Sequence, residues 1–522
     1  MIIQPFEYKG SSSLDTDILI IGSGCGGAIA AAKFSENGYR ITLVEEGPYM
    51  TQKDFNQNSR QLVPRMYRRG GGLATDDMSM RILQGSTFGG STTVNWMTCL
   101  RTPDFVLDQW SDQFGLTEYG PSEMKPFFDE VEKRLNVHKI KDTDHSRQNR
   151  IILDGGKALG IHAEASYNNS IDCIGCGTCG LGCPYNAKQD MRLTYLRDAL
   201  KSGITAYTST KAEKIKYIGK ERQITSITMQ GKDWDIPDKT LSVTSKRVIV
   251  AASAIQTPLL LQKSGLTKGK LVGKHLQVHP VAGAFAEYNE IIDPTYGIPQ
   301  TTTSEEYHDL DGNGYGFWLE VPDLEPFLLA VNYPGLGKSR REELKEFRKF
   351  GVIITLTRDG ANGKSTISNG EVKWRRGFNY QNGSFNLRQI PSIRYKLSKE
   401  DKYHLMKGLE NSIEIHLAAG AKRVLTLHNQ YTEIKNPSEI KKIWELKNGP
   451  NEMSIYSAHP TGTSRMGVDS KLSVVDKTAE MHHYPGIYVM DGSVLPTAPG
   501  VNPMITILAT LSRAIDLGDI QL

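Results

Sequence analysis

The sequence of 522 residues lacks any run of apolar residues long enough to form a membrane-spanning helix. It also lacks a strong charge of either sign. The 62 Lys and Arg residues against 58 Asp and Glu residues leave a net charge of +4, which gives no indication of binding to nucleic acid or to an anionic membrane. The first 17 residues contain no apolar core behind a basic segment, so they do not resemble a secretory signal. A cytoplasmic location is therefore expected.

Cysteine is scarce and unevenly placed. Four of the six cysteines lie between positions 173 and 183, and only Cys25 and Cys99 lie elsewhere. In a chain without a secretory signal, such a cluster indicates metal or redox chemistry more than structural disulfides.

The length of the chain exceeds the usual size of one domain and predicts two closely connected domains. Near the N-terminus, an apolar β-branched run at 17–21, a helical pattern at 28–34 and a second apolar run at 40–44 predict a βαβ unit with both strands in one parallel sheet. A later strand at 247–252 and a final apolar helix at about 503–517 predict that the same domain is assembled from distant pieces.

The middle of the chain differs in character. Between about 281 and 449, strands alternate with aromatic residues and turn signals, which is typical of a substrate-covering domain inserted into the first. We therefore predict a cofactor domain at 1–280 with a cysteine-rich insertion at about 165–190, a mainly substrate-binding domain at 281–449, and a return to the cofactor domain at 450–522.

A glycine-rich turn follows the first predicted strand directly. The segment Gly22–Gly27 fits G-x-G-x-x-G, in which Gly22 permits a tight turn, Gly24 lets the backbone approach a pyrophosphate and Gly27 allows close packing of strand and helix. Glu45 ends the second strand, where an acidic side chain accepts hydrogen bonds from an adenosine ribose. These features predict dinucleotide binding, but they do not separate FAD from NAD.

Further segments resemble the glucose-methanol-choline (GMC) oxidoreductase family, in the family's order and spacing. They are Gly85–Asn95, the segment from Ser253 to Pro258 with 272–280 behind it, the motif 459–467, and the run from 489 to 506. The resemblance implies an α/β fold in which a Rossmann-like FAD-binding domain, similar to that of p-hydroxybenzoate hydroxylase, carries an inserted α+β substrate domain built on an antiparallel sheet. It also implies that FAD is held by Gly22, Gly24, Gly27, Glu45, Gly85, Gly89, Gly90, Ser91, Asn95, Ala252, Asp491, Gly492, Asn502, Pro503 and Met504.

The same resemblance implies that a hydride passes from an alcohol or sugar carbon to flavin N5, with His459 as the catalytic base. Histidine suits this task because its unperturbed pKa is about 6.5. Asn502, 43 residues later, occupies the second catalytic position and would hydrogen-bond the developing alkoxide. Some members of the family link the flavin to a histidine where this chain has Val94, so the FAD is expected to be noncovalent.

The cysteine run has the spacing C-x-x-C-x-x-C-x-x-x-C-P, which is that of bacterial ferredoxins. It predicts an iron-sulfur cluster, either 4Fe-4S on Cys173, Cys176, Cys179 and Cys183 or 3Fe-4S on three of them. The alternatives are zinc, disulfides and free thiols. A cluster would favour a dehydrogenase that passes electrons to a partner protein or a quinone, whereas the alternative functions are an oxygen-using alcohol oxidase and a non-redox flavin-dependent lyase.

The substrate itself is not readable from the sequence. Resemblance to long-chain alcohol oxidases favours a hydrophobic alcohol, and resemblance to cluster-bearing sugar dehydrogenases favours a sugar. Four aromatic residues of the inserted domain could form an apolar pocket for it: Phe317, Trp318, Phe327 and Tyr333.

Overall fold

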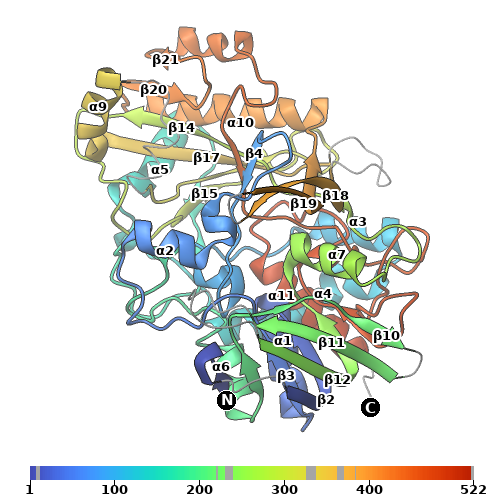
Figure 1. Ribbon diagram of the computed structural model, residues 1–522. Helices are drawn as coiled ribbons and strands as arrows, with labels where there is room; N and C mark the ends of the chain where they lie inside the picture. The colour runs from blue at the N-terminus through green and yellow to red at the C-terminus, as the bar shows by residue number, and fades with distance from the viewer. Residues whose placement is uncertain are drawn as a thin grey trace.

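The computed structural model describes residues 1–7, 12–218, 221–229, 239–324, 337–360, 370–381 and 384–518. Two large sheets organise it, a mainly parallel one near both termini and an antiparallel one at the opposite end of the molecule (Figure 1). Among the described residues, no helix combines the length and the apolar character needed to cross a bilayer.

The parallel sheet holds the predicted βαβ unit at its centre. The strands β8 (Thr205–Tyr207), β3 (Ile41–Val44), β2 (Ser12–Ile21), β12 (Lys239–Val250) and β23 (Ile487–Val489) run in this order and are mutually parallel. Their apolar side chains are buried, as expected for a parallel sheet with both faces covered. The predicted assembly of this sheet from distant parts of the chain is confirmed.

Helices α1 (Cys25–Glu36) and α11 (Met504–Leu517) pack against each other on this sheet. The close approach of α1 depends on glycine, because a Cβ atom on Gly27 would overlap the carbonyl oxygen of Gly22. Helix α4 (Pro121–Leu135) covers α11 on its other side.

The antiparallel sheet is built around β14 (Val281–Glu287), β17 (Phe350–Thr357) and β16 (Phe317–Glu320), with β20 (Arg423–Thr426) beside β14. Helix α10 (Lys399–Ala418) packs on one face of these strands. Because successive side chains of a strand point to opposite faces, alternate residues of β14 and β17 separate into two sets. Ala284, Ala286 and Ile353 lie in the core that includes α10, whereas Val281, Gly283, Phe285, Val352, Ile354 and Leu356 line a cavity.

The antiparallel sheet also includes strands from outside residues 281–449. Strand β22 (Ile455–Ser457) pairs with β14 and with β4 (Met80–Ile82), and β6 (Glu164–Ala165) extends the antiparallel sheet beyond β15 (Thr302–Ser304). Segments before 281 and after 449 therefore contribute to this sheet, and the boundaries at 280 and 449 stay a prediction.

A third, smaller sheet joins β13 (Lys274–Leu276) to the hairpin of β18 (Gly370–Gln381) and β19 (Ser384–Tyr395). The other helices and strands are α2 (Ser59–Met66), α3 (Asp104–Phe114), α5 (Arg147–Leu159), α6 (Tyr195–Lys201), α7 (Ser253–Lys263), α9 (Gly337–Lys345), β1 (Ile2–Ile3), β5 (His138–Lys139), β7 (Tyr167–Asn168), β9 (Thr210–Ala212), β10 (Lys216–Ile218), β11 (Glu221–Met229) and β21 (Glu433–Ile434).

Candidate active site

A cavity of about 790 Å³, called here the main cavity, extends from the carboxyl ends of the parallel strands to the antiparallel sheet. Ligands of open α/β sheets bind beyond the carboxyl ends of the strands. The main cavity is lined by both the Gly22–Gly26 turn and the predicted catalytic residues His459 and Asn502. A dinucleotide and a second, smaller molecule can therefore share it.

The glycine turn forms one end of the main cavity. Gly22 has φ +103°, and a Cβ atom there would overlap the carbonyl oxygen of Ala251. Gly24 is the N-cap of α1 and offers no side chain to the first amides of the helix. Such amides form an anion site at a helix N-terminus, so this end of the cavity fits a pyrophosphate.

Glu45 lies directly after β3 and holds the glycine turn in place. Its carboxylate accepts hydrogen bonds from the Ser23 amide (3.0 Å), the Ser23 hydroxyl (2.6 Å) and the Gly47 amide (2.7 Å). Burial raises the pKa of Glu45, and these hydrogen bonds oppose the rise. Its predicted contact with a ribose stays a prediction, but its place on the cavity wall is compatible with it.

The segment 85–95 lies against the glycine turn. A Cβ atom on Gly90 would be 2.7 Å from the Cα atom of Gly24, and the Gly89 amide donates to the Ser23 hydroxyl (2.9 Å). Asn95 donates its amide to the sulfur of Met504 (3.2 Å), while its buried Oδ1 accepts no hydrogen bond within the described part of the chain. An unpaired buried acceptor on the cavity wall fits the polar edge of a flavin ring.

Asp491 joins the C-terminal strand to α7. Its carboxylate accepts hydrogen bonds from the Ser253 amide (2.9 Å), the Thr257 hydroxyl (2.5 Å) and the Ser493 amide (2.8 Å). Burial raises its pKa.

The predicted FAD and catalytic residues are brought together with two exceptions. Gly27 packs inside against Gly22, and Gly89 lies behind the cavity wall, so both shape the site without lining it. The main cavity is lined by Gly22, Gly24, Glu45, Gly85, Gly90, Ser91, Asn95, Ala252, His459, Asp491, Gly492, Asn502, Pro503 and Met504.

His279 contacts His459 and the backbone just before Asn502, although the sequence assigned it no role in the chemistry. Its Nδ1 lies 3.2 Å from Nδ1 of His459, and its Nε2 accepts a hydrogen bond from the Gly500 amide (3.0 Å), two residues before Asn502. Burial lowers the pKa of His459 to about 4 and that of His279 well below its usual value. Both rings are therefore neutral at neutral pH.

Glu320 also lines the main cavity, and it was not predicted from the sequence as a site residue. It is 1% exposed and accepts a hydrogen bond from the Gln300 amide (2.6 Å). The Thr98 hydroxyl donates to the oxygen of the same Gln300 amide, which fixes its orientation. The only sequence signal was an acidic residue closing the apolar strand at 317–320, and a single such residue is not distinctive.

Two of the four aromatic residues predicted to form an apolar pocket, Phe317 and Trp318, do not line the main cavity. Phe317 lies in the core that includes α10, and Trp318 packs on Leu356 and Val501. Phe327 and Tyr333 lie outside the described residues.

The four clustered cysteines surround one small space, called here the cysteine pocket, with Met97, Lys188 and Gly297. All are free thiols, so the disulfide alternative has no support here. The pocket offers about 10 Å³, the room of one water molecule, and is too small for a cluster as it stands. Within the described part of the chain, no three Cys, His, Asp or Glu side chains converge as metal ligands. The four predicted ligands therefore lie around one pocket, but they are not arranged as the ligands of a metal site.

A thin wall separates the cysteine pocket from the main cavity. Asn95, Trp96 and Thr98 line the main cavity, whereas Met97 lines the cysteine pocket. Lys188, only 1% exposed, donates from Nζ to the carbonyl oxygens of Thr93 (2.7 Å), Asn95 (2.9 Å) and Cys179 (2.9 Å).

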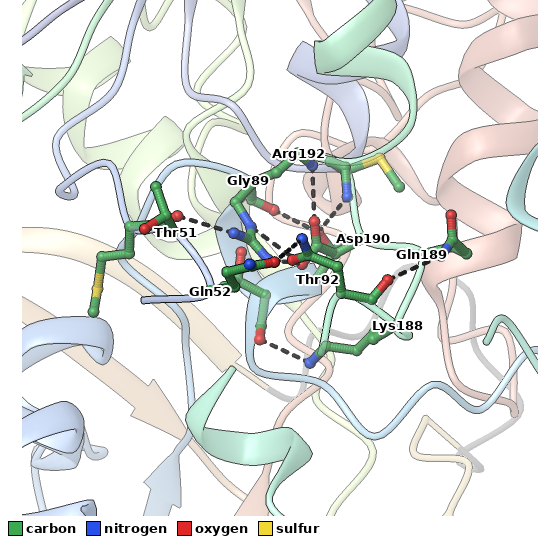
Figure 2. Close-up of polar contacts among 12 residues, drawn as sticks. Thr51, Gln52, Gly89, Thr92, Lys188, Gln189, Asp190 and Arg192 are labelled. Atoms are coloured by element: carbon green, nitrogen blue, oxygen red, sulfur yellow. Dashed lines mark hydrogen bonds and ion pairs between the residues drawn. The ribbon is translucent and has the colours of Figure 1, made fainter. Parts of the chain in front are cut away.

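The segment that carries Lys188 is itself anchored by a buried ion pair, shown in Figure 2. Arg192 binds Asp190 (2.6 Å) and donates to the Met50 carbonyl (2.9 Å). The Thr92 hydroxyl accepts from the Met191 amide (3.2 Å) and donates to the Gly89 carbonyl (2.6 Å). The cysteine loop and the glycine-rich segment are therefore held together as one unit.

Comparisons with known proteins agree with this geometry. Two family models, both described as GMC oxidoreductase, match residues 63–281 and 368–510, together more than half of the chain. Long-chain-alcohol oxidase FAO1 of Arabidopsis thaliana is 29% identical, over 96% of this chain and 66% of its own length. FAO4A of the same plant is 30% identical, over 95% of this chain and 67% of its own length. The chain thus spans about two thirds of these relatives.

Solved structures agree on the fold. Pyridoxine 4-oxidase from Mesorbium loti superposes with a TM-score of 0.68 over 96% of this chain and 99% of its own, at 18% identity. The expected fold, a Rossmann-like FAD-binding domain with a substrate domain on an antiparallel sheet, is confirmed. Because the family models match more than half of the chain and a relative is 30% identical, the chain belongs to the GMC oxidoreductase family.

Proposed function

We propose that this protein is an FAD-dependent dehydrogenase that oxidises the CH-OH group of an alcohol. The observation that carries the proposal is that His459 and Asn502 line the same cavity as the dinucleotide turn. The printed names of the relatives, long-chain-alcohol oxidases, support an alcohol as the substrate.

The residues of the main cavity fit FAD. The Gly22–Gly26 turn would hold the pyrophosphate, and the segment 85–95 with Asp491 and Met504 would hold the flavin half. When bound, FAD accepts the hydride that leaves the alcohol carbon.

The chain's own side chains bind and orient the alcohol. His459 and Asn502 would hydrogen-bond its oxygen, and the preorganised donors would stabilise negative charge that develops there. The carbon skeleton would lie against the apolar face of β14 and β17, lined by Val281, Phe285, Val352, Ile354 and Leu356. This wall favours a hydrophobic alcohol over a sugar.

Anaerobic mixing with a panel of alcohols and sugars tests this function. We expect apolar primary or secondary alcohols to bleach the visible absorbance of the oxidised flavin in a single turnover. A lyase would convert its substrate while the flavin stays oxidised, and that outcome would replace the proposal.

The flavin should be held without a covalent bond. The position at which a linking histidine occurs in some relatives is Val94, a buried residue of the cavity wall. Acid precipitation is expected to release all flavin into the supernatant. Yellow, fluorescent protein in the washed pellet would contradict this prediction.

We further propose that the four cysteines bind an iron-sulfur cluster, 4Fe-4S or 3Fe-4S. Its support is the ferredoxin spacing, the common cysteine pocket and the charge of Lys188. No carboxylate pairs with this buried ammonium in the described ranges, and thiolates or a cluster would supply the missing negative charge. The thiols would have to move outward from their present positions to make room.

Iron and acid-labile sulfide assays on anaerobically purified protein test the cluster. We expect about four acid-labile sulfides per chain, with about four irons for a 4Fe-4S cluster or about three for a 3Fe-4S cluster. The content should fall in Cys176→Ser and stay unchanged in Cys99→Ser, whose sulfur lies outside the cysteine pocket. Zinc without sulfide, or neither metal, would contradict the proposal.

The electron acceptor is proposed to be a partner protein or a quinone, taking two electrons for each alcohol oxidised. Turnover with a dye acceptor but not with oxygen would support a dehydrogenase, and hydrogen peroxide formed at a comparable rate would identify an alcohol oxidase instead. A cytoplasmic location also stays a prediction.

A further inference from the structure

Residues 277–279, called here the bridging segment, contact the loop that carries His459. The backbones of Gln277 and Thr461 exchange two hydrogen bonds (3.2 and 2.8 Å). The ring of His279 adds a hydrogen bond between its Nδ1 and that of His459 (3.2 Å). The bridging segment is therefore joined to this loop through both its backbone and a side chain.

The bridging segment also holds the loop that precedes Asn502. The Ala498 amide donates to the side-chain oxygen of Gln277 (2.6 Å), and the Gly500 amide donates to Nε2 of His279 (3.0 Å). Because a backbone amide can only donate, the neutral ring of His279 carries its proton on Nδ1, the atom that faces the neighbouring histidine ring. The two loops of the proposed site are thus connected through one short segment.

Asp359 binds all three residues of the bridging segment. It follows β17 and is completely buried. Its carboxylate accepts hydrogen bonds from the consecutive amides of Val278 (3.0 Å) and His279 (3.0 Å). Its carbonyl oxygen accepts one from the side-chain amide of Gln277 (3.0 Å). The position of the bridging segment therefore depends on this one residue at the end of β17.

The backbone of His279 needs such support. Its φ of +48° lies in the left-handed region, which residues other than glycine adopt uncommonly. Consecutive amides in a turn of this kind form a concave site for an anion, and the Asp359 carboxylate occupies it. A strained conformation persists only where its surroundings stabilise it. The bound carboxylate thus determines where the ring of His279 lies.

We propose that Asp359 is a positioning residue of the alcohol oxidation, which fixes His459 relative to Asn502 by anchoring the bridging segment. This inference rests on the proposed function. Neither Asp359 nor the bridging segment lines the main cavity, so their effect reaches a bound alcohol through His459 and Asn502.

The contacts of Asp359 favour its ionised form. Burial raises its pKa to about 7, and the nearby carboxylate of Asp401 adds to the rise. The Tyr395 hydroxyl (2.6 Å) and the two backbone amides oppose the rise, because they donate to the charged carboxylate. An amide group at this position would instead present a donor where only acceptors are satisfied.

Flavin reduction by an alcohol in Asp359→Asn tests the proposal. The variant keeps the size of the side chain but turns one acceptor into a donor. A displacement of about 1 Å at a reaction site costs about 100-fold in rate. We therefore expect the limiting rate at saturating alcohol to fall about 100-fold while FAD stays bound. The measurement is made above neutral pH, where Asp359 is ionised in the wild type.

Tyr395→Phe is the matched control. It removes the hydrogen bond from the Tyr395 hydroxyl to the same carboxylate and leaves both backbone amides in place. Thermal unfolding should show that both variants are destabilised, because each loses a buried hydrogen bond. Only Asp359→Asn should lose the rate of flavin reduction. A carboxylate with a purely structural role would lower stability in both variants without this difference in rate.

Nitrogen-15 NMR of histidine-labelled holoenzyme reads the position of the ring and needs no turnover. In the wild type, Nδ1 of His279 should carry a proton that is hydrogen-bonded to His459, and the variant His279→Gln assigns the signal. This signal should shift or disappear in Asp359→Asn and stay unchanged in Tyr395→Phe. If Asp359→Asn does not fold, Gln277→Ala takes its place, because it releases the bridging segment from the Asp359 carbonyl, and it should also slow flavin reduction and shift the signal.

Two results would overturn the proposal. One is a rate of flavin reduction in Asp359→Asn that is no lower than in Tyr395→Phe. The other is an unchanged His279 signal in Asp359→Asn. If no alcohol reduces the wild-type flavin, the proposed function fails instead, and the NMR comparison still decides whether Asp359 positions the ring of His279.

Discussion

Replacing His459 with alanine is expected to slow flavin reduction by an alcohol about 1000-fold, the upper range for removing one preorganised donor to a developing oxyanion. The substitution also leaves Nδ1–H of His279 without its acceptor at 3.2 Å, which adds the cost of an unpaired buried donor. Binding of FAD should be little affected, because His459 is not part of the glycine turn proposed to hold the pyrophosphate.

The effect is measured as the limiting rate of flavin reduction under anaerobic conditions, at saturating substrate. His138→Ala is a matched control, since this histidine is exposed and its ring bonds only the Asn136 carbonyl in the described structure. A loss of less than about tenfold in His459→Ala would show that His459 contributes no preorganised donor to the reaction.

Replacing Gly24 with valine is expected to weaken FAD binding about 1000-fold while the fold survives. Gly24 has φ −68°, which valine tolerates, and the nearest heavy atom to an added Cβ is the Cα of Gly90, 3.9 Å away. The side chain would instead enter the space in front of α1 where we propose that the pyrophosphate binds. Steric overlap and the loss of one charge-assisted hydrogen bond together cost about 4 kcal/mol, which corresponds to this factor.

Flavin content after dialysis and a fluorescence titration of the apoprotein with FAD measure the change. Gly449→Val is the control, because an added Cβ there also finds its nearest neighbour at 3.9 Å, but Gly449 does not line the main cavity. Circular dichroism separates lost binding from lost folding. A folded Gly24→Val protein that retains FAD at wild-type affinity would place the pyrophosphate elsewhere.

The parts of the fold that follow from local patterns were predictable from the sequence. The apolar runs at 17–21 and 40–44, with glycine between strand and helix, specify β2, α1 and β3 because their partners are near in the chain. The pairing of β22 with β4 joins segments more than 370 residues apart, and no local pattern encodes it.

The candidate site shows the same difference. His459 and Asn502 were found through motifs, but their neighbours His279 and Glu320 lie in other strands and loops and were not predicted. A tautomer depends on the partner of each ring nitrogen, and that partner is a property of the folded chain. The spacing of the four cysteines likewise predicted that they lie together, and they do line one pocket. The small size of that pocket could not be predicted from the spacing.

A crystal structure of the FAD-bound protein with an unreactive alcohol analogue is the most direct test of this account. We expect the pyrophosphate to lie at the N-terminus of α1 and the analogue's oxygen to lie within hydrogen-bonding distance of His459 and Asn502. An analogue bound away from these two side chains, or a flavin ring outside the main cavity, would contradict it.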